Sequence, residues 1–155
     1  MLILGLDPGS RHTGYGLVEA DGETLRAIDY GRFSCPASQP VPNRLAEMAW
    51  QLSELIAQWQ PEVAVLETPF HGLNTRSLVV LSQARGALLA VLAARGLEIG
   101  EYSPAEVKSA VAGQGRATTE QVARMGKLQL SLIDDNLNAD ASEALALAIC
   151  FAQRR

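Results

Sequence analysis

Cysteine and histidine are both scarce in this chain. It has two cysteines, Cys35 and Cys150, and two histidines, His12 and His71, none of them in a spacing typical of a zinc site. We therefore expect two buried free thiols in a reducing, cytoplasmic setting, rather than a disulfide framework. So few histidines and cysteines also argue against a Ser–His–Asp or Cys–His catalytic arrangement.

The chain also lacks an apolar run of the 18 or so residues that a membrane span needs. The segment from Met1 to Asp7 has no basic region, so we expect a first strand there rather than a signal peptide. Hydrophobic residues make up 48% and charged residues 19% of the 155 residues, which is typical of a globular protein with a substantial core. We expect a single domain over residues 1–155, and no membrane association.

A basic excess, which is common in nucleic-acid-binding proteins, is missing as well, because the net charge is −4. The charge is unevenly placed, however. Between Phe70 and Leu132, seven basic residues stand against four acidic ones. A local basic face is compatible with this distribution, although composition alone does not establish it.

Hydrophobic periodicity predicts an α/β protein. Three strands over residues 2–7, 13–19 and 25–33, with an Asp21-Gly22 turn, predict an antiparallel meander. Further strands are predicted over 63–67 and 97–102, and helices over 42–59, 76–95, from 104, 118–132 and 139–152. This order predicts a five-stranded mixed sheet flanked by helices, which is the layout of the ribonuclease H-like fold.

Two acidic residues stand at the ends of predicted buried strands. Asp7 ends the first strand and Glu67 ends the fourth. If these strands are parallel neighbours, both carboxylates lie at the edge of the sheet where α/β proteins bind ligands. Either acid alone is as easily a solvent-facing charge at a strand end, but the pair in this context favours a site.

The last predicted helix supplies a second acidic pair. Asp140 and Glu143 are spaced i, i+3 and share one face in or near the first turn. Acids in a first turn are also favoured by the helix dipole and need no site. Four converging carboxylates would repel one another unless cations lie between them, and Mg²⁺ or Mn²⁺ accepts such ligands. Two such ions could support phosphodiester hydrolysis.

Several segments resemble the RuvC-type Holliday-junction resolvases over nearly the whole chain and in the same order. They are Asp7-Pro8-Gly9-Ser10-Arg11-His12-Thr13-Gly14-Tyr15-Gly16, Glu67-Thr68-Pro69-Phe70 with Asn74, Ser82-Gln83-Ala84-Arg85-Gly86-Ala87, Ser103-Pro104 with Val107-Lys108, Gly113-Gln114-Gly115, and Ala139-Asp140-Ala141-Ser142-Glu143-Ala144-Leu145-Ala146. Each motif alone is weak, and the ordered set is strong.

The resemblance implies a ribonuclease H-like homodimer that nicks two opposed strands of a four-way DNA junction with Mg²⁺ or Mn²⁺, together with a branch-migration complex of the RuvA and RuvB type. Asp7, Glu67 and Asp140 fall on the metal-binding acids of this family. Glu143 falls on a fourth acid that is usually Asp, so it departs from the pattern.

The resemblance also implies contacts to DNA. Phe70 falls on an aromatic that contacts bases, although packing of Phe70 on the core is an alternative. Lys108 falls on a DNA-contacting lysine, and we assign Asn74 and Arg76 to the DNA-binding surface. The family's second lysine is missing near Gly115, so Arg116 is assigned the phosphate contact, with a solvated loop arginine equally compatible.

The helix predicted over 76–95 is apolar on more than one face, which indicates burial on two sides, against the sheet and against a partner subunit or another helix. Three other functions remain as alternatives. They are an actin-like sugar kinase, suggested by Asp-Pro-Gly before a glycine-rich hairpin, a non-catalytic junction-binding protein, and a nuclease of the same fold that acts on RNA.

Overall fold

The computed structural model describes residues 1–69 and 74–155. It contains a five-stranded sheet in the order β3-β2-β1-β4-β5. The strands are β1 (Leu2–Asp7), β2 (His12–Asp21), β3 (Thr24–Ser34), β4 (Val63–Glu67) and β5 (Glu98–Tyr102). The first three form an antiparallel meander, and β4 runs parallel to both β1 and β5. The predicted mixed α/β sheet is confirmed.

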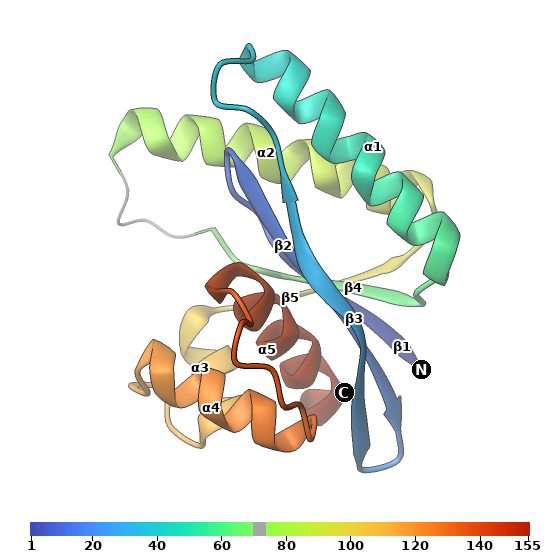
Figure 1. The fold of residues 1–155 in the computed structure, drawn as a ribbon, viewed down its shortest axis with the longest axis vertical. Helices are drawn as coiled ribbons and strands as arrows, with labels where there is room; N and C mark the ends of the chain where they lie inside the picture. The colour runs from blue at the N-terminus through green and yellow to red at the C-terminus, as the bar shows by residue number, and fades with distance from the viewer. Residues whose placement is uncertain (70–73) are drawn as a thin grey trace.

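Helices cover both faces of this sheet (Figure 1). Apolar residues of α1 (Val41–Trp59) and α2 (Thr75–Ala94) pack with Leu4, Leu6 and Leu17 on one face. The other face carries α3 (Pro104–Ala112), α4 (Thr119–Gln129) and α5 (Ala139–Arg154), with α5 against Ile3 and Val18. Alternate residues of β1 therefore face opposite cores, as the pleat of a strand requires.

Local signals place most helix ends. Ser103 and Glu106 form the predicted capping box at the start of α3. The helix predicted over 118–132 is shorter in the structure, because α4 ends at Gln129. The chain leaves the helical path after α4 at Ser131, which has a left-handed φ of 50°. Non-glycine residues seldom adopt this conformation, and nothing in the sequence pattern predicts it at Ser131. The apolar periodicity continues past Gln129, so the predicted helix was too long.

Glycines allow α5 to approach the sheet closely. A Cβ atom on Gly5 would overlap the carbonyl oxygen of Ala144, and one on Gly14 would overlap the carbonyl oxygen of Asp140. Gly5 lies on β1 and Gly14 on β2, and both therefore face α5. The absence of these two side chains lets the backbone of α5 rest directly on the strands, which sets the height of its first turn above Asp7.

Helix α2 is less covered than its composition suggests. Within its twenty residues the buried ones are Ala84, Leu88 and Leu92, and the side chain of Val79 is 51% exposed. By length and mean hydropathy alone this helix would suffice to cross a membrane, a property that an apolar helix of a globular protein can share. One face of the helix therefore packs on the molecule, and the other, which carries Val79 among small and polar residues, is open. Cys35 and Cys150 are free and buried, as predicted.

Candidate active site

The carboxylates of Asp7 and Glu67 lie at the ends of neighbouring parallel strands. Leu6 of β1 is paired with Leu66 of β4, and each acid is the next residue and the last of its strand. The arrangement predicted from the strand order is confirmed. Arg85 of α2 supports the end of β4 by donating from Nη2 to the Glu67 carbonyl oxygen at 3.4 Å and to Glu101 Oε2 at 2.8 Å.

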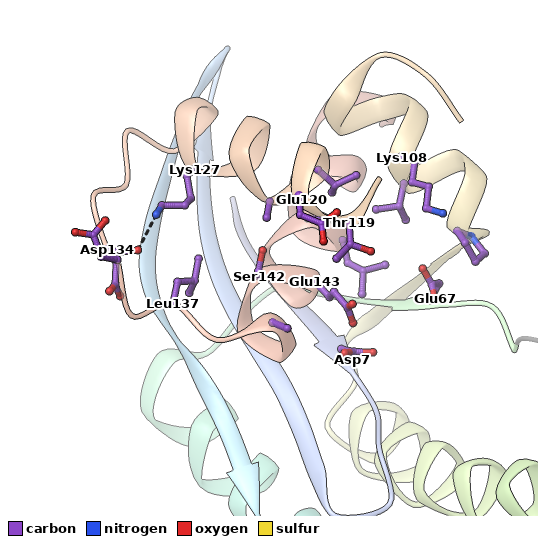
Figure 2. A pocket seen from close by; sticks show the side chains of 18 residues that line it. Asp7, Glu67, Lys108, Thr119, Glu120, Lys127, Asp134, Leu137, Ser142 and Glu143 are labelled. Atoms are coloured by element: carbon purple, nitrogen blue, oxygen red, sulfur yellow. Dashed lines mark hydrogen bonds between the residues drawn. The ribbon is translucent and has the colours of Figure 1, made fainter. Parts of the chain in front are cut away.

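The first turn of α5 brings the second acidic pair to the same place. The helix begins where Asn138 Oδ1 accepts a hydrogen bond of 2.8 Å from the Ala141 N–H. Asp140 is its second residue and Glu143 lies one turn further on. Figure 2 shows the carboxylate of Glu143 pointing toward Asp7, with Glu67 beside them.

Three of the four predicted acids line one cavity of about 510 Å³. Asp7, Glu67 and Glu143 form its acidic end, and Lys108 of α3 stands next to Glu67 (Figure 2). The opposite walls come from α4 and from the segment before α5, and they include Thr119 and Lys127. Motifs did not indicate these two residues, because the packing of α4 on α5 is what brings them to the cavity.

The acids influence one another strongly. Burial raises the pKa of Asp7 to about 9, and a hydrogen bond with Glu143 and the charges of Glu143, Asp140 and Glu67 act in the same direction. Burial also raises the pKa of Glu67, with a further contribution from Glu143, while the charge of Lys108 opposes the shift. The other three predicted acids therefore all lie within electrostatic reach of Asp7.

Asp140 is turned away from the cavity. Its Oδ2 atom lies 3.5 Å from Nη1 of Arg32, a residue of β3 that the motifs did not single out. Arg32 pairs with Gly14 across the β2–β3 ladder, and Gly14 pairs with Asp7 across β1–β2. Directly paired residues share a face of the sheet, so Arg32 and Asp7 flank the site at which α5 rests. Only the strand register could have indicated Arg32.

The acidic end fits divalent metal ions by its chemistry. Carboxylate oxygens are the ligands that Mg²⁺ and Mn²⁺ prefer, and a cation would relieve the repulsion that raises the pKa of Asp7. Among residues 1–69 and 74–155, no three acidic, histidine or cysteine side chains already converge on a single ion. For all four acids to hold ions together, Asp140 would have to turn from Arg32 toward Asp7, and Asp7, Glu67 and Glu143 would have to move closer to one another.

The predicted DNA-binding residues occupy different places. Lys108 lines the cavity, whereas Arg116 lies exposed in the loop between α3 and α4. Asn74 Oδ1 accepts a hydrogen bond of 2.9 Å from the Ser77 N–H and so caps α2, and Arg76 is exposed in the first turn of that helix. Phe70 lies outside the described residues, as does His71. His12 is the first residue of β2 and is paired with Ser34, the last residue of β3. Its Nδ1 atom lies 2.8 Å from Ser34 Oγ.

Comparisons with known proteins agree with this geometry. The family model of crossover junction endodeoxyribonuclease RuvC matches residues 3–151. The RuvC proteins of Citrifermentans bemidjiense and Alkaliphilus metalliredigens are 44% and 41% identical, and each match covers 98% of this chain and more than nine-tenths of the relative. The structure of Thermus thermophilus RuvC in complex with a Holliday junction substrate superposes with a TM-score of 0.92 at 27% identity, covering 99% of this chain and 93% of that one. The chain therefore belongs to the RuvC family of crossover junction endodeoxyribonucleases.

Proposed function

We infer that this chain is an endodeoxyribonuclease that resolves four-way Holliday junctions by nicking two opposed strands, in homologous recombination and DNA repair. The observation that carries the inference is the acidic end of the cavity, which Asp7, Glu67 and Glu143 line, within a fold that a relative uses to bind junction DNA. The family membership selects DNA junctions among the phosphodiester substrates that such a site suits.

We propose that Asp7, Glu67, Asp140 and Glu143 hold Mg²⁺ or Mn²⁺, with two ions in each active site. Bound ions would activate a water molecule and stabilise the leaving oxygen of a phosphodiester. Burial and mutual repulsion of the acids support this assignment, since they make the site unfavourable for its own negative charges. Lys108, which lines the cavity near Glu67, would contact a phosphate of the strand that enters the cavity.

We further propose that Lys108, Arg116, Asn74, Arg76 and Phe70 contact the junction. Lys108 and Arg116 belong to one side of the site, on α3 and the loop that follows it. Asn74 and Arg76 belong to the other side, at the start of α2. Basic residues on both sides of the acidic cavity would hold the flanking phosphates, because the phosphate backbone supplies most of the binding free energy.

We propose a homodimer as the active form, acting in the cytoplasm with a branch-migration complex of the RuvA and RuvB type. Two symmetric nicks need two equivalent active sites, and a twofold dimer supplies them. The uncovered side of α2, which includes the half-exposed Val79 and the exposed Gly86, Ala90 and Ala93, supports this proposal, because a partner subunit could pack against it.

Cleavage assays on four substrates test the proposed function. The chain would be incubated with a four-way junction, a linear duplex, a single strand and an RNA–DNA hybrid, each with Mn²⁺, with Mg²⁺ and with EDTA. We expect metal-dependent paired nicks in the junction and little cleavage of the other substrates. Preferential cleavage of the hybrid would instead indicate a nuclease that acts on RNA, and binding without cleavage under every condition would indicate a non-catalytic junction-binding protein.

A further inference from the structure

A second hollow, separate from the acidic cavity, lies between α1, α2 and the loop after β1. Its volume is about 400 Å³, and its lining residues are Ser10, Arg44, Arg76, Ser77, Val80 and Leu81. Two of the six are arginines and two are serines, and none of these described lining residues is acidic. A concave site with two guanidinium groups and two hydroxyl groups suits a phosphate group.

The two arginines have unused hydrogen-bonding capacity. Arg44 Nη1 donates to the main-chain oxygen of Ser10 at 3.2 Å, but its Nε is buried and has no partner among the described residues. Neither Arg44 nor Arg76 forms a salt bridge with a described acidic residue. The positive charges of these two guanidinium groups are therefore not neutralised by a described carboxylate, and a phosphate in the hollow would supply the missing negative charge.

The start of α2 adds to the same potential. Arg76 and Ser77 belong to its first turn, in which main-chain N–H groups point out of the helix. The positive end of the helix dipole therefore faces the hollow together with the two guanidinium groups. Arg44 comes from α1, so side chains from two elements converge on one place.

The hollow is connected to the active site through a short loop. Ser10 follows Asp7 by three residues, so their Cα atoms are at most about 11 Å apart. The two sites lie on opposite faces of the sheet, because α5 packs on one face and α1 and α2 pack on the other. A DNA strand that crosses the carboxyl end of β1 could therefore place one phosphate at Asp7 and another in the hollow.

We propose that Arg44, Arg76, Ser10 and Ser77 form a binding site for a backbone phosphodiester of the cleaved strand. The limit of about 11 Å between Asp7 and Ser10 suits a phosphate within about three nucleotides of the cleavage position, since each nucleotide advances the strand by at least about 3.4 Å. This assignment rests on the proposed function and adds to it a second anchor, which fixes the register of the strand. Arg44 is thereby a DNA-binding residue, with its bond to Ser10 holding the loop after Asp7.

The salt dependence of junction binding tests this site. Affinity of the full chain for a four-way junction would be measured in EDTA at several KCl concentrations, for the wild type, Arg76→Gln, Arg44→Lys and the control Arg95→Gln. Arg95 is also exposed but stands at the opposite end of α2. We expect Arg76→Gln to lower the slope of log affinity against log salt by about one and to weaken binding about tenfold near 0.1 M salt, with no change for Arg95→Gln.

Neutral methylphosphonate groups locate the contacted phosphate. One would be placed at each of the first three backbone positions on either side of the cleavage position. We expect a methylphosphonate at one of these positions to weaken binding by the wild type and by Arg95→Gln. The same substitution should not affect binding by Arg76→Gln, because this variant has already lost the contact between Arg76 and that phosphate. Arg44→Lys keeps the charge and should retain the slope while losing part of the affinity.

The proposal is overturned if Arg76→Gln keeps the slope of Arg95→Gln, or if every methylphosphonate weakens Arg76→Gln as much as the wild type. Melting temperatures of all variants confirm that each is folded. Failure of the wild type to prefer junctions over linear duplex would contradict the proposed function instead. In that case, a lower slope of log affinity against log salt for Arg76→Gln, on the junction or on the duplex, would still support the phosphate site.

Discussion

The main-chain oxygen of Asp140 occupies the space in which a side chain of residue 14 would lie, so a Cβ atom on Gly14 would overlap it. Gly14 is also the partner of Asp7 across the β1–β2 ladder. The acid-bearing turn of α5 therefore sits beside Asp7 because residue 14 has no side chain. This contact determines how far the carboxylates of α5 stand from those of the sheet.

Replacing Gly14 with alanine should push the first turn of α5 off the sheet. We expect Gly14→Ala to lower the free energy of unfolding by about 1–3 kcal/mol and to reduce cleavage by at least tenfold even where the protein is fully folded. Gly126→Ala is the matched control, because Gly126 also faces α5 but a Cβ there would be in ordinary contact, 3.7 Å from Ile149 Cδ1. Equal cleavage by both variants at a temperature where both are folded would contradict this role of Gly14.

Asp7 should be essential for cleavage and dispensable for binding. Asp7→Asn removes a metal ligand and, where Asp7 is ionised, a negative charge close to the DNA phosphates, so we expect no cleavage with Mg²⁺ or Mn²⁺ and junction affinity equal to or above that of the wild type. Single-turnover cleavage and equilibrium binding measure the two effects separately. Cleavage by Asp7→Asn near the rate of the wild type would exclude the proposed two-metal site.

Stability without metal should fall as the pH rises. The pKa of Asp7 is raised from 3.8 to about 9, so between these values the folded chain holds a proton that the unfolded chain has released. Deprotonation therefore favours the unfolded state, and the wild type should lose stability relative to Asp7→Asn across this interval, by at most about 1.4 kcal/mol per pH unit.

Urea unfolding of both proteins in EDTA at about pH 5, 7 and 8.5 measures this difference. We expect the free energy of unfolding of Asp7→Asn to rise relative to that of the wild type at each step to higher pH. Mg²⁺ should make this difference smaller, because a bound cation stabilises the ionised acid. A difference that stays constant with pH would show that Asp7 is not protonated in the folded chain.

Variants of Glu143 test whether the metal site contains four acids or three. Its carboxylate points toward Asp7 and raises the pKa of that acid, which suits a shared ion. If Glu143 binds metal, Glu143→Gln should lower cleavage by orders of magnitude, and Glu143→Asp should retain activity with a changed preference between Mg²⁺ and Mn²⁺. If Glu143 is only a charge near a helix start, Glu143→Gln should cost a few tenths to about 1 kcal/mol of stability and leave cleavage unchanged. Melting temperature and single-turnover cleavage separate the two outcomes.

The open face of α2 should hold the dimer together. Light scattering of the wild type should give twice the monomer mass of 16.6 kDa. Val79→Glu places a charge in this face and should yield monomers that bind junctions weakly and lose paired nicking. Ile133→Glu is the control, since Ile133 is 95% exposed and lies outside α2. A wild-type chain that is monomeric at micromolar concentration and still makes paired nicks would contradict the dimer.

Local sequence patterns determined the elements and the positions of most acids. Alternating apolar residues, the Asp21-Gly22 turn and the Ser103–Glu106 capping box act over a few neighbouring residues, and the structure contains each of them. The end positions of Asp7 and Glu67 followed from the strand order, because parallel neighbours end at the same edge of the sheet. The spacing of Asp140 and Glu143 put both acids near the start of α5, but it did not determine their directions, because Asp140 contacts Arg32 whereas Glu143 lines the cavity.

Tertiary structure decided how these parts meet. The ladder between β2 and β3 shifts by one residue between Leu17 and Val18, and this shift pairs Gly14 with Arg32 rather than with Gly31. Without it, Arg32 would point to the opposite face of the sheet and could not reach Asp140, since one residue of slip exchanges the two faces of a strand. The meeting of Arg44 with Arg76 depends in the same way on the packing of α1 against α2. Such contacts join residues distant in sequence, and no local pattern encodes them, because their geometry depends on how whole elements pack.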